Sequence, residues 1–213
     1  DNVTLFPHGI LDFNFNSTKS VFNSRDWKIS SYGFCLPNKG FPELIRAIDL
    51  IRSRSQSVKL TLHTAIYNDH YYWFYNDLIK LIKILDLENN VFINKNYLSD
   101  QETLENLSES DLIVYAYQST KESSSAAVRH GIATRKPVAV TPLSIFDDVN
   151  EVTQQLPGIR VNDIGDGIIN LMNNYQSLLD FQSHTYDWRM QHNFSELTQR
   201  LVGMIKSLKI NSI

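Results

Sequence analysis

The sequence contains one cysteine, no apolar run long enough to cross a membrane, and no excess of positive charge. Cys35 has no cysteine partner within the chain, which excludes an intrachain disulfide and indicates a reducing compartment. No apolar stretch approaches the roughly 18 residues of a membrane-spanning helix. The formal net charge of -3, with both signs interspersed, argues against nucleic acid as a partner, because binding it needs a basic face.

A secretion signal is also missing from the start of the sequence. We therefore expect a cytoplasmic protein, which a domain outside this chain could place peripherally at the inner face of a membrane. The chain begins at Asp1 and not at methionine, as an excised piece would, so an upstream signal remains open.

What the sequence does contain is the composition of a globular protein, with 42% hydrophobic and 20% charged residues. A chain of 213 residues with this composition can bury a full core without disulfides or a structural metal. From about Lys28 to Asn174, short apolar segments alternate with amphipathic ones. This alternation predicts an α/β fold, an open parallel sheet with helices on both of its faces.

One domain accounts for this pattern. We expect it to comprise residues 28–213 and to include a C-terminal amphipathic helix, while residues 1–27 lack periodicity and should pack on the domain edge. The expected strands are 28–34, 59–65, 90–94, 111–117, 137–141 and 158–161. Three helices are expected to begin after Gly40, at the Ser99-x-x-Glu102 capping pattern and after the serines at 123–125. Three more are expected at 69–86, at 166–173 and within 187–208.

The first loop with chemical potential is "GFCLPNKGF", Gly33 to Phe41, between the first strand and the first helix. Ligands of open α/β sheets bind beyond the carboxyl ends of the strands, where such loops lie. Gly33 and Gly40 permit unusual backbone angles, and Lys39 precedes a helix start, where an ammonium and free N–H groups can converge on a phosphate. The alternative is a plain turn with a solvated lysine. The loop matches neither a Walker motif nor Gly-x-Gly-x-x-Gly.

The second loop is "STKESSSAAVRHG", which follows the apolar strand "DLIVYAY". Capping a helix needs one serine, and here Ser123, Ser124 and Ser125 follow one another. Small side chains leave backbone amides accessible, as a diphosphate requires. Glu122 lies next to this positive helix end and could accept hydrogen bonds from sugar hydroxyls, or it could only complement the helix dipole at a surface turn.

Three further features carry weaker signals. The aromatic run at Tyr71–Tyr75 could stack on sugars or enter a membrane interface, but five consecutive aromatics on a helix point in all directions, so we expect several to be packed. His63 and His70 have no partners at zinc-binding spacing, and we expect Asp147 and Asp148 to form a solvated turn. No metal site is predicted.

In order along the chain, these loops resemble the nucleotide-binding half of GT-B glycosyltransferases, specifically those of glycosyltransferase family 4, whose two domains are Rossmann-like. The family pattern has Lys-Gly before a helix, later Glu-x7-Glu, and then Gly-x-Pro-Val. The similarity spans nearly the whole chain and is carried by "TLFPHGI", "NKGFPELIRAI", "YLSDQETLENLSESDLIVYAYQSTKE", "GIATRKPVAVT" and "YDWRMQHNFSEL".

The resemblance implies a Rossmann-like fold and particular roles where residues match. Lys39 would contact the donor diphosphate, Glu122 would bind hydroxyls of the transferred sugar near the reacting carbon, and the amides and hydroxyls of Ser124 and Ser125 would hold the diphosphate. Tyr97 lies where the family's base-binding loop would be, and could stack on the base.

Two positions depart from the family pattern. The second glutamate, which grips the ribose in the family, is His130 here, and the basic residue that often precedes the lysine is Phe34. His130 could donate to a ribose hydroxyl or be a packed helix residue. Arg129 could replace the missing base or lie on the solvent face. The predicted site comprises Glu122 as the catalytic residue and, for binding the donor, Lys39, Gly40, Ser123, Ser124, Ser125, Arg129, His130 and Tyr97.

The resulting hypothesis is the donor-binding half of a retaining glycosyltransferase. It would use a nucleotide-diphosphate sugar as substrate without cofactor or metal, a glycan or lipid-linked acceptor, and a preceding Rossmann-like domain of the same polypeptide. The departures at Phe34 and His130 favour an alternative, a catalytically degenerate Rossmann domain that docks partners. A third possibility is a sugar-nucleotide epimerase of the same architecture.

Overall fold

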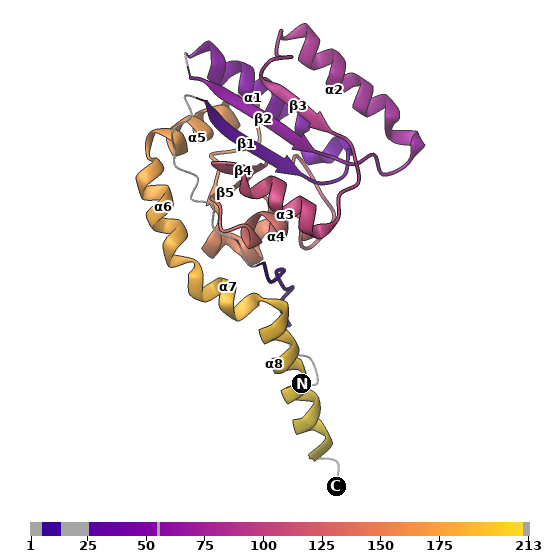
Figure 1. The fold of residues 1–213 in the computed structure, drawn as a ribbon, viewed down its shortest axis with the longest axis vertical. Coiled ribbons are helices and arrows are strands. Elements are labelled where there is room, and N and C mark those ends of the chain that lie inside the picture. Colours follow the sequence, from indigo (N-terminus) through magenta and orange to yellow (C-terminus); the bar gives the residue numbers. More distant parts are fainter. Residues whose placement is uncertain (1–5, 14–25, 55, 211–213) are drawn as a thin grey trace.

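The computed structural model describes residues 6–13, 26–54 and 56–210 of the chain. At its centre lies a parallel sheet with the strand order β3-β2-β1-β4-β5-β6 (Figure 1). This confirms the predicted open parallel sheet. The strands are β1 (Trp27–Tyr32), β2 (Val58–His63), β3 (Val91–Asn94), β4 (Leu112–Tyr115), β5 (Val138–Val140) and β6 (Gln154–Gln155).

Helices cover both faces of the sheet, and each face has its own apolar cluster. One cluster joins the sheet to α1, α2 and α5, and the other joins it to α3, α4 and the 3-10 helix η3. These elements are α1 (Phe41–Ser53), α2 (Tyr72–Ile84), α3 (Asp100–Ser108), α4 (Ala126–Ala133), η3 (Ser144–Val152) and α5 (Val161–Asn173).

Strand β4 shows why the apolar segments of the sequence form a central sheet. Leu112 and Val114 belong to the cluster with α1 and α5, whereas Ile113 and Tyr115 belong to the cluster with α3 and α4. Successive side chains of a strand point to opposite faces, so a strand covered on both sides must be apolar throughout. Burial of this uninterrupted run places β4 in the middle of the sheet.

The strand order reverses between β1 and β4. From β1 the chain adds β2 and then β3 on one side, and it returns to add β4, β5 and β6 on the other. The connections that follow β1 and β4 therefore leave the same edge of the sheet in opposite directions. Such a reversal opens a crevice at the carboxyl ends of the strands.

The predicted strand at 158–161 is wrong. The sixth strand is the short β6, whose Gln154 pairs with Ala139 of β5. Helix α5 begins at Val161, well before the predicted start at residue 166, because the Asp163 carboxylate accepts a hydrogen bond from the backbone N–H of Arg160 at 3.2 Å. This contact caps the first turn and leaves residues 158–160 as the approach to a helix.

The C-terminal part contains more helices than predicted. Helix α6 (Tyr175–His184) was not expected, and the single terminal helix expected within 187–208 is divided into α7 (Tyr186–His192) and α8 (Phe194–Ile210). The break lies at Asn193, whose ψ of 154° is extended. There Ile10 pairs with the break, since its N–H donates to the His192 carbonyl (2.8 Å) and its carbonyl accepts from the Phe194 N–H (3.1 Å).

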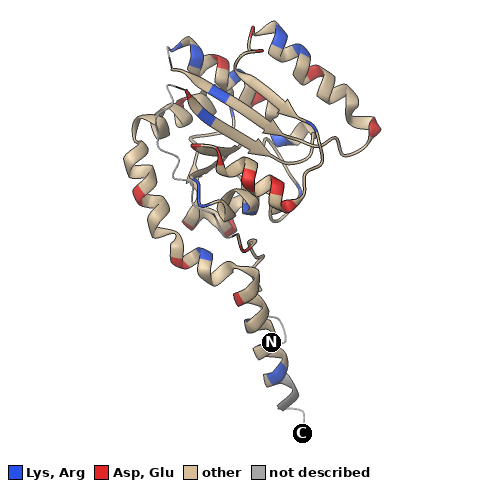
Figure 2. Ribbon diagram, viewed as in Figure 1, with Lys and Arg blue, Asp and Glu red and all other residues tan. Residues whose placement is uncertain are grey.

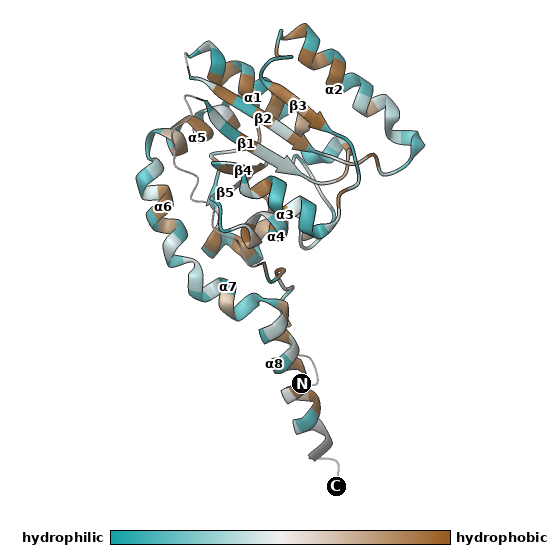
Figure 3. Cartoon of the chain, viewed as in Figure 1, coloured by the Kyte–Doolittle hydropathy of each residue, from teal (hydrophilic) through white to brown (hydrophobic). Residues whose placement is uncertain are grey.

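Helix α8 extends away from the sheet, and residues 6–13 lie beside its start (Figure 1). Leu197 of the expected amphipathic helix is buried, but its apolar residues Phe194, Leu201 and Ile205 are exposed. Figure 3 shows apolar and polar residues alternating along this helix. The side chain of Leu208 and residues 1–5 and 14–25 of the expected edge segment lie outside the described part of the structure.

The charges of the described residues follow the interspersed pattern of the sequence. Lysine and arginine are distributed over several helices and strands, with aspartate and glutamate between them (Figure 2). In the described part of the chain, no helix combines the length and the apolar character needed to cross a bilayer.

Candidate functional site

A cavity of about 350 Å³ opens at the carboxyl edge of the sheet, beside strands β1, β2, β3 and β4. We call it the edge cavity. Its walls come from the connections that follow these four strands and from the start of α4, which is where the strand order predicts a crevice. The lining residues are Tyr32, Gly33, Phe34, Lys39, His63, Ala65, Asn96, Tyr97, Leu98, Asp100, Tyr117, Glu122, Ser125, Ala126, Ala127 and His130.

Lys39 lies inside this cavity and is 8% exposed. It ends the 3-10 helix η1 (Pro37–Lys39), directly before α1. Its Nζ lies 4.1 Å from the centroid of the Tyr117 ring and 3.8 Å from Oε2 of Glu122. The aromatic face and the carboxylate both stabilise the ammonium at this position. The solvated lysine that was the alternative is therefore wrong, and a nearly buried cation faces the cavity.

The backbone at Gly40 explains how Lys39 is held. Gly40 has a φ of 72°, in the left-handed region that favours glycine, and Gly33 at the other end of the loop has a φ of 144°. Both predicted backbone specials are thereby confirmed. A side-chain carbon at Gly40 would overlap the carbonyl group of Ala116 at the end of β4. The β1–α1 loop therefore packs directly on the chain that leads to Glu122.

Ser125 is the serine that caps helix α4. Its Oγ accepts a hydrogen bond from the backbone N–H of Val128 (3.4 Å) and lies 3.3 Å from the Tyr117 hydroxyl. Ser125 lines the edge cavity together with Lys39 and Glu122, so the structure brings these three predicted residues together. Ser123 and Ser124 are not among the lining residues, and the Ser124 hydroxyl donates to Asp148 at 3.1 Å.

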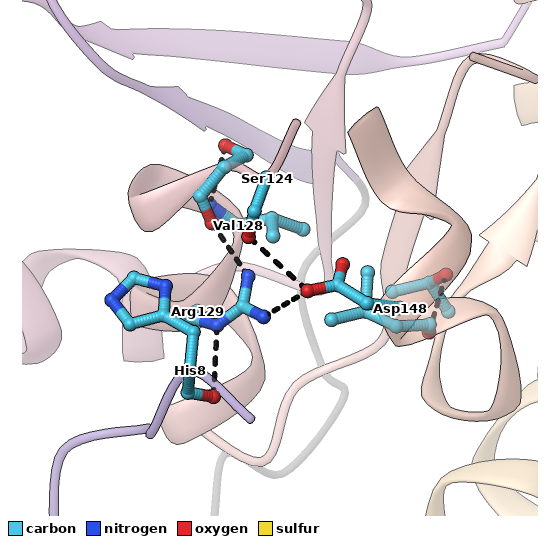
Figure 4. Close-up of polar contacts among 8 residues, drawn as sticks. His8, Ser124, Val128, Arg129 and Asp148 are labelled. Carbon is cyan, nitrogen blue, oxygen red and sulfur yellow. Dashed lines mark hydrogen bonds and ion pairs between the residues drawn. The ribbon is translucent and has the colours of Figure 1, made fainter. Parts of the chain in front are cut away.

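Arg129 is not among the residues that line the edge cavity and is 4% exposed, so the alternative in which it lies on the solvent face is wrong. Its guanidinium donates to the Ser125 carbonyl (2.9 Å), to the His8 carbonyl (3.2 Å) and to the Asp148 carboxylate (Figure 4). Asp147 and Asp148 are exposed as expected, but they lie in η3 and not in a turn, and the Asp148 carboxylate binds both Arg129 and Ser124. Arg129 instead joins helix α4, η3 and the segment around His8.

His130 lies at the edge cavity and is paired with Asp100, a residue that the sequence analysis did not select. Nε2 of His130 lies 3.0 Å from Oδ1 of Asp100, and Nδ1 lies 3.2 Å from the Ala126 carbonyl. Asp100 is the first residue of α3 and lies within the capping box of Ser99 and Glu102 that the structure confirms. A carboxylate therefore lines the cavity next to the histidine that the sequence analysis had selected. The sequence feature that could have indicated it is the acidic first turn of the helix after strand β3.

His63 was considered only as a metal ligand, yet it ends strand β2 and lines the edge cavity. It is 6% exposed, and its Nδ1 is buried without a hydrogen-bond partner among the described residues. Burial lowers the pKa of His63 from 6.5 to about 4, so the imidazole is neutral at pH 7. Within the described ranges, no cluster of three or more histidine, cysteine or acidic residues could hold a metal ion.

Aromatic side chains form the outer part of the site. Tyr97 is 80% exposed and lines the edge cavity from the β3–α3 connection. Phe34 also lines the cavity, and its ring lies 5.2 Å from that of Tyr67. In the aromatic run at residues 71–75, Phe74 is buried as the packing interpretation predicts, whereas Tyr72 and Trp73 are exposed.

Comparison with known proteins identifies this fold in solved structures, although no protein-family model and no curated protein matches the chain. A glycosyltransferase from Rickettsia africae aligns with a TM-score of 0.73 and 17% identity, over 86% of this chain and 48% of that one. HepE from Anabaena, in complex with UDP and glucose, aligns with a TM-score of 0.73 and 15% identity, over 86% and 49%.

A third structure corresponds to a single domain. The C-terminal domain of LpcC, a group 1 family glycosyl transferase from Francisella tularensis, aligns with a TM-score of 0.64 and 16% identity, over 76% of this chain and 83% of that one. The chain thus spans about half the length of the first two proteins. At these identities the likeness is one of fold: the chain has the Rossmann-like fold found in the C-terminal domain of a glycosyltransferase.

Proposed function

We propose that this chain is the donor-binding half of a retaining glycosyltransferase, which transfers a sugar from a nucleotide-diphosphate sugar to a glycan or lipid-linked acceptor. The observation that carries the proposal is the juxtaposition of three groups in one cavity. A nearly buried lysine, a carboxylate 3.8 Å from it and the N-cap of a helix all line the carboxyl edge of the sheet.

Lys39 and the start of α4 would hold the diphosphate. Breaking a glycosidic bond to a nucleoside diphosphate leaves negative charge on the departing phosphate oxygens. A fixed ammonium and the free N–H groups of a helix N-terminus can stabilise this charge without a metal ion. The Lys39 ammonium is already positioned by Tyr117 and Glu122, so it needs little rearrangement when the anion binds.

The carboxylates at the cavity would bind hydroxyl groups. Glu122 lies next to Lys39 and is exposed, so it can accept hydrogen bonds from the transferred sugar beside the diphosphate. Asp100, held by His130, presents a second carboxylate from the start of α3. We assign this pair to the ribose hydroxyls. The loss of a glutamate at position 130 then leaves the cavity with a carboxylate for this role.

The binding site for the acceptor would lie in a second, Rossmann-like domain that precedes this chain in the same polypeptide. The chain corresponds to about half of the Rickettsia and Anabaena proteins. Helix α8 extends from the domain and exposes Leu201, Val202 and Ile205. Burying these side chains against a partner domain would remove apolar surface from water, and this would stabilise the contact by about 25 cal/mol per Å² of surface buried. A domain with this arrangement would be catalytically incomplete alone.

The proposed function is tested by saturation-transfer difference NMR on this chain with UDP, GDP and their sugars at millimolar concentration. We expect transfer to the nucleotide protons of at least one of these ligands, because the isolated half retains Lys39 and the start of α4. A docking domain with a degenerate site would give no transfer from any of them, and that result would contradict the proposal.

A substitution at Glu122 distinguishes binding of the sugar from binding of the diphosphate. Glu122→Gln should weaken binding of the nucleotide sugar about 3- to 10-fold, because a charged hydrogen-bond acceptor is lost. The corresponding nucleoside diphosphate should bind equally well or more tightly, since a negative charge next to Lys39 has been removed. Isothermal titration calorimetry of both ligands measures the difference.

The matched control for this substitution is Glu88→Gln, which removes an exposed carboxylate outside the edge cavity. It should leave both affinities unchanged. An equal loss of affinity for the nucleotide sugar and the nucleoside diphosphate in Glu122→Gln would rule out the assigned contact with sugar hydroxyls.

A further inference from the structure

His63 is a buried polar residue at the edge cavity whose side chain has no hydrogen-bond partner among the described residues. It differs in this respect from the other buried polar residues of the cavity. Lys39 contacts Tyr117 and Glu122, and Ser125 contacts Tyr117 and Val128. Buried polar groups in native proteins are nearly always paired. The unpaired buried atom here is Nδ1, so a contact of the ring with a ligand in the cavity falls to Nε2.

The surroundings of His63 determine which nitrogen faces the cavity. Nδ1 is fully buried, and Nε2, which is not among the buried unpaired atoms, keeps access to the cavity. An orphaned buried N–H is rarer than an under-satisfied acceptor. The favoured tautomer therefore has its lone pair on the buried Nδ1 and its proton on Nε2. Burial lowers the pKa of His63 to about 4, which keeps this ring uncharged at neutral pH.

The sheet order gives the cavity two chemically different ends. Lys39, Glu122 and Ser125 belong to the connections after β1 and β4, which are adjacent strands. His63 and Tyr97 belong to the side of β2 and β3. A diphosphate at Lys39 with its sugar toward Glu122 leaves only the β2–β3 side for the nucleoside. This end offers a neutral imidazole and an exposed aromatic ring, which suit an uncharged heteroaromatic base.

We propose, building on the donor-binding function proposed above, that the Nε2–H group of His63 donates a hydrogen bond to an acceptor atom on the base of the bound nucleotide. His63 is then a specificity-determining residue of the nucleoside end, separate from the phosphate contacts of Lys39. Because strand β2 holds the imidazole between its register neighbours Tyr32 and Asn94, the donor is already oriented before the ligand binds.

The test uses calorimetric titration of the whole chain with UDP, GDP and inorganic pyrophosphate. His63→Leu removes the hydrogen-bond donor and fills its buried position with an apolar side chain. It should lower the affinity for the nucleoside diphosphate that binds to the wild-type chain about 3- to 10-fold, and it should leave the affinity for pyrophosphate unchanged. His63→Gln, which restores an N–H donor, should recover part of the loss. His70→Leu, at an exposed histidine that does not line the cavity, is the matched control.

A second measurement requires no substitution. In the wild-type chain labelled with ¹⁵N-histidine, the imidazole Nε2–H signal of His63 should shift on addition of the nucleoside diphosphate and stay in place on addition of pyrophosphate. A structural role for His63 would give no such difference between the two ligands.

The outcomes distinguish this proposal from the function on which it rests. If Lys39→Ala weakens the nucleoside diphosphate while His63→Leu leaves it unchanged, the role of His63 is overturned and donor binding stands. Equal weakening of pyrophosphate and nucleoside diphosphate by His63→Leu also overturns the base contact. If neither UDP nor GDP binds wild type, both proposals fail.

Discussion

Replacing Lys39 by alanine should weaken the binding of a nucleoside diphosphate to this chain about 10- to 100-fold. Hydrogen bonds to charged groups contribute about 1.5–3 kcal/mol each, and the Lys39 ammonium is nearly buried at the cavity that would receive the phosphates. The substitution also leaves Glu122 without its cationic neighbour, which adds repulsion toward an anion. Isothermal titration calorimetry with UDP and GDP measures the effect.

The matched control is Lys121→Ala, which removes the same charge from an exposed residue next to Glu122. Lys121 is not among the residues that line the edge cavity, so it should change affinity less than about 2-fold, as expected for a screened surface charge. Equal losses for the two lysines would mean that only the overall charge matters, and would contradict a specific phosphate contact of Lys39.

The second large effect concerns stability. Gly40→Ala should lower the free energy of unfolding by about 2–5 kcal/mol, since a left-handed conformation costs an L-residue roughly 1–2 kcal/mol and overpacking costs about 1–3 kcal/mol more. At Gly40 the φ is 72°, and the added carbon meets the backbone carbonyl of Ala116, which cannot rotate away like a flexible side chain. Urea denaturation followed by circular dichroism measures the change.

Gly203→Ala provides the opposite case in the same chain. Gly203 lies within helix α8, and an added carbon there has no atom within 4 Å among those described. Alanine should be neutral or stabilising by up to about 1 kcal/mol at this position, because it favours a helix over glycine. If Gly40→Ala proved as well tolerated as Gly203→Ala, the tight packing of the β1–α1 loop on the chain directly after β4 would be disproved.

Much of the fold was predictable from the sequence because its signals are local. The apolar run at Leu112–Tyr115 indicates a strand buried on both faces, and the structure places β4 in the middle of the sheet. Ser99 and Glu102 predict a capping box that the structure confirms. Gly33 and Gly40 predict special backbone angles, and both have positive φ.

The prediction failed where the sequence of a segment is compatible with more than one secondary structure. Residues 158–161 are too short for their period to separate a strand from a helix start, and the Asp163 carboxylate decides in favour of a helix. Helix α6 buries only Leu178 and Gln182, so its sequence lacks a continuous apolar stripe. The break at Asn193 results from pairing with Ile10, far away in the sequence.

The candidate site was predictable as loops but not as contacts. Lys39, Glu122 and Ser125 were selected because each lies near a helix start, and all three line one cavity. The pairing of Asp100 with His130 joins residues 30 positions apart, and the bond from Arg129 to the His8 carbonyl spans 121 positions. Nothing near Arg129 in the sequence indicates that its guanidinium is satisfied by oxygens from three separate segments.

The hydrogen bonds of Ile10 and Arg129 also form a mechanical linkage. Residues 8–10 are fastened to the break before α8 by two backbone hydrogen bonds and to the N-cap of α4 through the Arg129 guanidinium. The base of the helix that protrudes farthest from the sheet is thus connected, through residues 8–10 and Arg129, to the Ser125 carbonyl at the wall of the edge cavity.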